Sequence, residues 1–341
     1  MDCHLLSHGI SIEKDSLHDC CLMRDIGSAG NPFILSINED KTIDWEKVFE
    51  LKKTQKNSKL QNPKDCLGCF ALTSENNFDN DEDYISYINF NHWNICNSRC
   101  IYCSSNYFGG DKYFNVYPLI KSLIDAGKFN NSGEITFQGG EPTVLPEFEE
   151  LLRLFSEQGI KIRIHSSGIK YSKAIEEGLQ KSLVSVVISP DSAIPETYEK
   201  IKRVKCFDKV WTNLENYISN GKNPNNVKAK FIIIPGINDT IEEIDTFIKK
   251  SQSIGLINLI WEVEGIYAGR YGYDVPNVST LIKYAVARTL EQGMNYEFYD
   301  NAVYCMKKFG EENFKTENIS LLKKEYFELR EKYKERNIDY I

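Results

Sequence analysis

The sequence predicts an α/β protein built around a mainly parallel sheet. It has 341 residues, of which 41% are hydrophobic and 26% are charged, an ordinary globular composition with enough apolar material for a core. From Tyr84 onward, short apolar runs alternate with longer amphipathic segments, which is typical of βα repeats joined by right-handed crossovers. Periodicity alone does not separate an open doubly wound sheet from a partial barrel, and both remain open at this point.

The expected elements follow one another in a regular order. The candidate strands are 84–90, 133–138, 160–166, 184–189, 227–234 and 256–264. The amphipathic segments between them are 117–127, 148–159, 171–180, 210–221 and 241–255, and several of them end on the glycine that favours a helix C-cap. Two more helices are expected at about 278–292 and 317–336.

Composition divides the chain into three regions. Residues 1–83 are polar and rich in cysteine, and we expect them to be irregular apart from one helix at about 45–56 and an Asn- and Asp-rich linker at 76–83. Residues 84–265 hold the βα repeats. Residues 266–341 begin with a Tyr- and Gly-rich loop and continue as helices.

Charge and hydropathy exclude several classes of protein. With 41 basic and 49 acidic residues the formal charge is −8, which argues against a broad surface for nucleic acid or anionic membrane. No apolar run approaches the ~20 residues that a transmembrane helix needs. The first residues lack the basic and apolar pattern of a signal peptide. We therefore expect a cytoplasmic protein.

Three of the ten cysteines form a tight cluster directly after the first candidate strand. Cys96, Cys100 and Cys103 are spaced C-x3-C-x2-C, at the strand end where βα proteins build active sites. A tetrahedral zinc knuckle would need a fourth ligand, for which His92 is the candidate. A cubane iron–sulfur cluster held by three thiolates keeps one iron open, and an open iron is a site for chemistry.

This cluster, with Tyr102 before its last cysteine, resembles the signature of the radical S-adenosylmethionine (SAM) superfamily. The second strand ends in the GGEP motif of that family at 139–142. The third ends in HSSG (165–168) where relatives usually have Thr-Asn-Gly, the fourth resembles peptide-modifying relatives over 188–203, and the fifth ends in PGIND (235–239). The resemblance covers about 84–265 and implies a partial (β/α)6 TIM-like barrel, preceded by an irregular cysteine-rich metal module and followed by C-terminal helices.

The same resemblance implies the cofactors and the residues that hold them. Cys96, Cys100 and Cys103 would bind a [4Fe–4S] cluster whose open iron chelates the SAM amino and carboxylate groups. Other family positions correspond to Gly139 and Gly140 near the SAM ammonium, Glu141 on the ammonium or bracing the turn, Pro142 in the same motif, Tyr102 beside the adenine, Ser189 and Asp191 on the ribose or carboxylate, Lys202 or Arg203 on the carboxylate, and Ile234 and Gly236 in the adenine wall. Ser189 and Asp191 suit a helix N-cap equally well.

The remaining N-terminal cysteines indicate a second metal site. Cys66 and Cys69 form a C-x2-C pair, a strong metal signal because both thiolates point to one side of a turn. Together with Cys3 and Cys20 they are similar to the SPASM and twitch modules of radical SAM enzymes, although those usually follow the barrel. We expect a second [4Fe–4S] cluster here, with Cys21 as the alternative to Cys20 and structural zinc as the alternative metal.

The resemblance implies an enzyme that cleaves SAM reductively to a 5′-deoxyadenosyl radical and abstracts a hydrogen atom from its substrate. The first hypothesis is oxidation or epimerisation of a sugar, cyclitol or nucleotide-linked saccharide; the second is a maturase that modifies a peptide or protein side chain; the third is a non-catalytic iron–sulfur electron carrier. Glu262 and Glu264, on one face of the sixth strand, and Arg270 in the following loop are the candidate substrate residues. A flavodoxin or ferredoxin is the expected electron donor.

Overall fold

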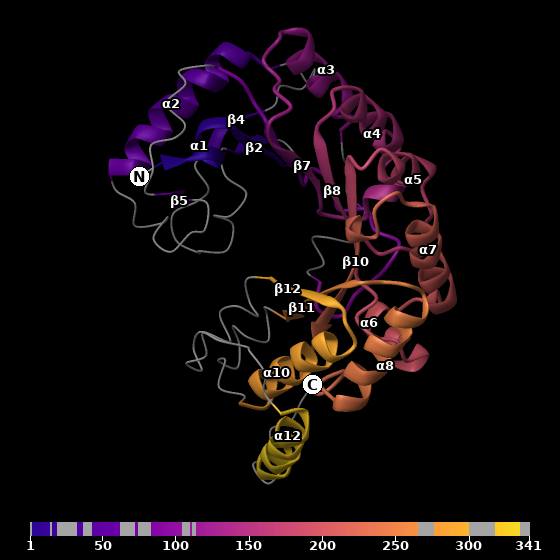
Figure 1. Ribbon diagram of the computed structural model, residues 1–341. Coiled ribbons are helices and arrows are strands. Elements are labelled where there is room, and N and C mark those ends of the chain that lie inside the picture. The colour runs from indigo at the N-terminus through magenta and orange to yellow at the C-terminus, as the bar shows by residue number, and fades with distance from the viewer. Residues whose placement is uncertain are drawn as a thin grey trace. The chain divides into compact units, whose positions relative to one another are not determined.

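The computed structural model describes residues 2–13, 16–18, 33–36, 43–61, 72–73, 83–103, 110, 114–264, 276–299 and 318–334. The chain divides into two compact units (Figure 1). The first unit comprises Met1–Cys96 and Ser105–His165, and the second comprises Asn97–Ser104 and Ser166–Ile341.

The sheet of the first unit has the strand order β4-β3-β2-β6-β7-β8. Four strands are parallel to their neighbours: β2 (Gly9–Ile12), β6 (Tyr87–Phe90), β7 (Glu134–Phe137) and β8 (Lys161–Ser166). The antiparallel strands β3 (Ser16–His18) and β4 (Phe33–Ser36) continue the sheet beyond β2. The first three expected strands are therefore present as β6, β7 and β8, each slightly shorter than its apolar run.

The expectation that residues 1–83 are irregular apart from one helix is wrong. The segment Gly9–Ile12 is a buried parallel strand that pairs with β6 in the register Ile10↔Ile88 and Ile12↔Phe90. The sequence GISI is too short and too mixed to be assigned in isolation, and it becomes a strand by pairing with a partner far along the chain. The structure also places α1 (His4–His8) and a short antiparallel ladder of β1 (Asp2–Cys3) with β5 (Leu72–Thr73) in this region.

Helices of the first unit are α2 (Trp45–Gln61), α3 (Tyr117–Asp125) and α4 (Phe148–Glu157). The expected helix at 45–56 is α2, which continues to Gln61. α4 buries Phe148 and Phe155 at helical spacing. The Phe148 ring packs edge-on against Phe137 with centroids 5.2 Å apart, and Phe137 stacks on Phe90 at 4.6 Å. Aromatic packing thus fixes α4 on strands β6 and β7.

The second unit has four parallel strands in the order β9-β10-β11-β12. They are β9 (Val184–Ile188), β10 (Val227–Ile233), β11 (Asn258–Val263) and β12 (Asn295–Phe298). The first three match the expected strands. β12 was not expected, because its NYEF sequence is half-exposed and lacks a long apolar run.

Helices of the second unit follow the strands. They are α5 (Lys173–Gln180), α6 (Pro195–Lys202), α7 (Phe207–Asn220), α8 (Ile241–Ser253), α10 (Pro276–Glu291) and α12 (Ile319–Lys334). Phe231 of β10 packs edge-on against Phe247 of α8 with centroids 4.9 Å apart, and Trp261 of β11 lies 5.5 Å from Phe231. Alternate residues of these strands therefore face the helices, and the residues between them face the opposite side of the sheet.

The fold class predicted from the sequence is confirmed as a mainly parallel α/β sheet covered by helices. Neither unit closes its sheet into a barrel: within the described ranges, β4 and β12 each have a single neighbouring strand. The βα order, from β6 with α3 to β11 with α10, is the one that the alternating pattern indicates.

Candidate functional site

The turn that carries Cys100 and Cys103 is held against the end of helix α6. The Cys103 N–H donates to the Cys100 carbonyl at 3.0 Å, which closes the turn. The N–H groups of Arg99 and Ile101 donate to the carbonyls of Lys202 and Ile201, both at 3.0 Å. The Ser98 hydroxyl lies 3.5 Å from the Cys100 sulfur. Backbone hydrogen bonds thus place the two half-buried thiols at the C-terminal end of α6.

Cys96, the first cysteine of the cluster, is half-buried and belongs to the first unit. Across the described residues, no three His, Cys, Asp or Glu side chains are arranged so that they could hold a metal ion. The cysteine spacing, rather than a preformed cage, is what indicates a metal site here.

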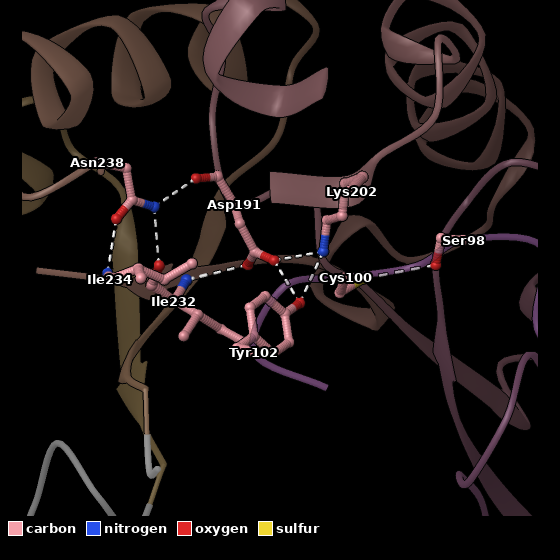
Figure 2. Close-up of polar contacts among 8 residues, drawn as sticks. All are labelled: Ser98, Cys100, Tyr102, Asp191, Lys202, Ile232, Ile234 and Asn238. Atoms are coloured by element: carbon pink, nitrogen blue, oxygen red, sulfur yellow. Dashed lines mark hydrogen bonds and ion pairs between the residues drawn. The ribbon is translucent and has the colours of Figure 1, made fainter. Parts of the chain in front are cut away.

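A buried polar network stands beside this turn (Figure 2). The Tyr102 hydroxyl donates to Asp191 Oδ2 at 2.6 Å and accepts from Lys202 Nζ at 2.8 Å. Lys202 Nζ also forms an ion pair with Asp191 Oδ2, and both side chains are almost completely buried. The ammonium lies 5.2 Å from the centroid of the Tyr102 ring. The three predicted cofactor-binding residues Tyr102, Asp191 and Lys202 therefore come together in one network.

Asp191 is the centre of this network and has an unusual backbone. Its φ of 59° lies in the left-handed region, which Asp adopts more readily than most residues. Asp191 Oδ1 accepts the Ile232 N–H at 3.0 Å, and its carbonyl accepts from the Asn238 amide at 2.8 Å. The Asn238 side chain also binds the Ile232 carbonyl and the Ile234 N–H, at 2.8 and 2.6 Å. Asn238 is thus a site residue that sequence reasoning missed, although it lies within the quoted PGIND segment.

An apolar wall surrounds the ring of Tyr102. Ile201, Ile232 and Ile234 form a buried cluster, and Ile101, Tyr102 and Ile237 pack against it. Burial of the hydroxyl, followed by the nearby charge of Asp191, raises the pKa of Tyr102 well above its ordinary range. Tyr102 therefore stays a neutral hydrogen-bond donor. Ile234, predicted as part of an adenine wall, belongs to this apolar cluster.

The glycine turn after β7 lies in the first unit. Gly139 has a φ of 97°, a conformation that strongly favours glycine. The Gly140 N–H donates to the Trp93 carbonyl at 3.1 Å, and the Glu141 N–H donates to the Ile95 carbonyl at 2.8 Å. A Cβ on Gly140 would lie 2.3 Å from the Ile95 oxygen. The turn and the segment before Cys96 are thus packed too closely for a side chain.

Glu141 braces this turn. Its Oε1 accepts the backbone N–H of Thr143 at 3.2 Å and the Thr143 hydroxyl at 2.6 Å, and it caps the short 3-10 helix Pro142–Val144. The carboxylate is 2% exposed. Glu141 was expected either to bind the SAM ammonium or to brace the turn. Its contacts with Thr143 are those expected for bracing the turn.

Other predicted residues occupy separate positions within the second unit. Ser189 follows β9, and its N–H donates to the Ser166 carbonyl at 3.3 Å. Arg203 is exposed and has a φ of 55°, ending α6 as a left-handed cap. Gly236 has a φ of 78° in the turn before Asn238. In the HSSG segment (165–168), which differs from the usual Thr-Asn-Gly of relatives, the Ser167 hydroxyl donates to Asn97 Oδ1 at 2.9 Å. This segment therefore contacts the residue that follows Cys96.

Glu262 and Glu264 are both buried at the C-terminal end of β11, each 8% exposed. The Val263 N–H donates to Glu262 Oε1 at 3.0 Å, and the Glu264 N–H donates to the Ile233 carbonyl at 3.0 Å. Arg270 lies outside the described residues.

The N-terminal cysteines are described only in part. Cys3 is 5% exposed and lies opposite Leu72 in the β1–β5 ladder. Cys20, Cys21, Cys66 and Cys69 lie outside the described residues.

The chain is similar to known radical SAM proteins. Residues 90–249 match the model of the radical SAM superfamily. The chain is 33% identical over 196 residues to the mitochondrial GTP 3',8-cyclase of Arabidopsis thaliana, and 28% identical over 205 residues to the GTP 3',8-cyclase of Clostridium botulinum (strain Okra / Type B1). These matches cover 56% and 58% of this chain but only 48% and 62% of the relatives.

Solved structures support the fold. Streptococcus suis SuiB bound to S-adenosylmethionine superposes with a TM-score of 0.54 at 14% identity, covering 81% of this chain and 61% of SuiB. SuiB bound to its precursor peptide SuiA gives a TM-score of 0.52 at 13% identity, covering 76% of this chain and 65% of SuiB. None of the described helices is long and apolar enough to cross a bilayer.

Proposed function

Because residues 90–249 match the radical SAM superfamily, we propose that Cys96, Cys100 and Cys103 hold the [4Fe–4S] cluster that this superfamily uses together with SAM. Three soft thiolate donors within eight residues fit a cubane cluster with one open iron. When bound, the cluster and SAM supply a carbon-centred radical that removes a hydrogen atom from a substrate. The observation that carries the proposal is the cysteine turn anchored on α6 beside the Tyr102–Asp191–Lys202 network.

The contacts in the second unit refine the roles of the SAM-binding residues. Both oxygens of Asp191 are engaged, by the Ile232 N–H on one side and by Tyr102 and Lys202 on the other. We assign Asp191 and Lys202 to positioning Tyr102, whose ring and the neighbouring Ile234 would bind the adenine. Ser189 then remains for the ribose. The exposed Arg203 remains for the SAM carboxylate, because Lys202 is already paired.

In the first unit, the Gly139–Gly140 turn would receive the SAM ammonium on its backbone, with Pro142 and Glu141 keeping the turn in shape. No side chain fits at Gly140, because Ile95 and Trp93 fill the space beside it, and a ligand at this turn would therefore meet backbone groups. The carboxylate of Glu141 is occupied by Thr143, which supports its bracing role.

We assign the N-terminal cysteines to a second [4Fe–4S] cluster held by Cys3, Cys66, Cys69 and one of Cys20 or Cys21. The pairing of Cys3 with Leu72 supports this assignment, because Leu72 follows Cys69 by three positions in the sequence. A variant with Cys96, Cys100 and Cys103 changed to Ala should retain about four irons with iron–sulfur absorption. Finding zinc instead would make the module a structural clip.

For the substrate, we favour a small molecule that carries a sugar, such as a nucleotide or nucleotide-linked saccharide. The two curated relatives are named for a reaction of GTP, and they match more than half of this chain. Glu262, Glu264 and Arg270 are the candidate residues for contacting it. Peptide modification is the second candidate, supported by the 188–203 segment; the likeness to SuiB extends to the fold alone. A flavodoxin or ferredoxin would deliver the electron.

The test is SAM cleavage. Anaerobically reconstituted chain with a strong reductant should form 5′-deoxyadenosine, and Cys100→Ala should abolish it. Cys206→Ala is the matched control, because Cys206 is also half-buried in the second unit and lies outside the cluster motif. Full iron loading of wild type without any deoxyadenosine, with or without lysate metabolites, would refute the enzymatic function. Stimulation by nucleotides but not by peptides would select the favoured substrate class.

A further inference from the structure

Two lysines lie on the face of β10 that is turned away from the helices. Phe231 packs on Phe247 of α8, so its neighbours Lys230 and Ile232 face the other side of the sheet, and Lys228 shares that side. Lys228 and Lys230 differ in their partners. Lys228 forms an ion pair with Glu297 of β12, whereas Lys230 forms no hydrogen bond or ion pair with any described residue.

The side chain of Lys230 is half-buried. Its ammonium lies 5.2 Å from the centroid of the Tyr299 ring, just after β12. Loss of contact with water lowers the pKa of Lys230. The negative charges of Asp191 and Glu262 act in the opposite direction but do not cancel this effect. Asp191 already pairs with Lys202 and accepts two further hydrogen bonds. Glu262 faces the same side from β11, opposite Ile232 in the register, without an ion pair to Lys230.

Lys230 is also next to the network described above. Ile232, the following residue on the same face, packs in the apolar cluster with Tyr102. The Ile232 N–H donates to Asp191. The Lys230 ammonium, which has no hydrogen-bond or ion-pair partner within the described ranges, therefore lies two residues along β10 from Ile232 of the apolar cluster around Tyr102. This is the face where a substrate would meet the SAM-binding residues.

We propose that Lys230 binds an anionic oxygen of the substrate, in a phosphate or carboxylate group, and so fixes the substrate beside the Tyr102 wall. Partial removal of the half-buried Lys230 ammonium from water costs free energy unless the charge is paired, and contact with an aromatic ring offsets only part of that cost. An incoming anionic oxygen would supply a charge-assisted hydrogen bond. This inference rests on the proposed function and assigns to its substrate an anionic group.

The experiment compares three variants as holoenzymes with SAM under anaerobic conditions. Lys230→Met removes the charge while keeping the apolar stem, and Lys230→Arg keeps the charge. Lys228→Met removes the same charge from the same face of the same strand and is the matched control. Isothermal titration with pyrophosphate and, separately, with succinate distinguishes a phosphate site from a carboxylate site. Deoxyadenosine formation is measured in parallel for every variant.

We expect wild type to bind one of the two probes, Lys230→Met to bind it at least about tenfold more weakly, and Lys230→Arg and Lys228→Met to stay within about threefold of wild type. Binding of neither probe by wild type, or equal binding by Lys230→Met, would overturn the inference and make Lys230 a structural neighbour of Glu262. These results are separable from the proposed function, which fails only if wild type forms no deoxyadenosine.

Discussion

Replacing Gly140 with alanine should damage the segment that leads to the cysteines. The new Cβ would lie 2.3 Å from the Ile95 oxygen and 2.7 and 2.9 Å from two atoms of the Trp93 ring. Backbone atoms have to move, since such contacts are far shorter than van der Waals separation. Overpacking of this kind typically removes about 1–3 kcal/mol, and the two hydrogen bonds that join this turn to Trp93 and Ile95 would weaken by about 1 kcal/mol together. We therefore expect a loss of about 2–4 kcal/mol in the free energy of unfolding.

Urea denaturation of the metal-free chain measures this loss, and iron content after reconstitution reports its effect at Cys96. Gly127→Ala is the control, because Gly127 also lies in the first unit and its φ of 67° carries conformational strain, but no atom lies within 4 Å of the added Cβ. The control should lose about 1 kcal/mol. A Gly140→Ala chain that unfolds like the control, with wild-type iron, would show that the turn and the cysteine segment yield easily and that the packing argument is wrong.

Three further predictions concern buried polar groups. Tyr102→Phe removes a hydroxyl that bridges Asp191 and Lys202 while leaving their ion pair, so we expect a loss of about 1–2 kcal/mol in urea denaturation; no loss would mean that the hydroxyl is replaceable by water. Asp191→Asn leaves the buried Lys202 ammonium without a counter-charge and should lose about 3–5 kcal/mol, with part of it recovered when Lys202→Met is added; a loss that does not shrink in the double variant would contradict the pairing. Burial lowers the pKa of His92, so the folded chain binds this proton less tightly than the unfolded chain, and stability should fall as the pH drops below the ordinary value of 6.5. His92→Phe should remove that part of the slope between about pH 7.5 and 5.5, and an unchanged slope would assign it to other groups.

Local patterns were sufficient for most of the fold. The helix α4 repeats its apolar residues at helical spacing. The segments that became β8 and β10 alternate apolar residues with charged ones, so their type is evident without tertiary information. The N-terminal strand β2 was not predictable in this way, because its four residues become a strand only by pairing with β6. The half-exposed β12 carries a similarly weak signal and depends on pairing with β11.

In the candidate site, too, the residue types could be predicted from the sequence, whereas their contacts could not. Family motifs identified the cysteines, Tyr102, Asp191 and Lys202, but their mutual contacts join residues up to 100 positions apart and follow only from the fold. Asn238 was missed because its role is to bind backbone groups of strand ends, which leaves no chemical signature beyond an ordinary turn residue. Sequence spacing likewise does not reveal that Lys228 pairs with Glu297 while Lys230 lies over the Tyr299 ring, because both contacts depend on strand β12 and the residue after it.

The parallel pairing of β2 with β6 has a consequence for handling and synthesis of the chain. During translation β2 is made long before β6, so the hairpin of β2 with β3 can form early while the parallel contact waits for residues 87–90. A chain shortened to begin at residue 84, the boundary that composition suggests, would expose the apolar edge of β6 at Ile88 and Phe90. An uncovered flat edge of this kind is a template for association between molecules. Strand β2 thus covers the edge of β6 and protects it from pairing with other molecules. The aggregation of shortened versions should therefore be measured before their activity is interpreted.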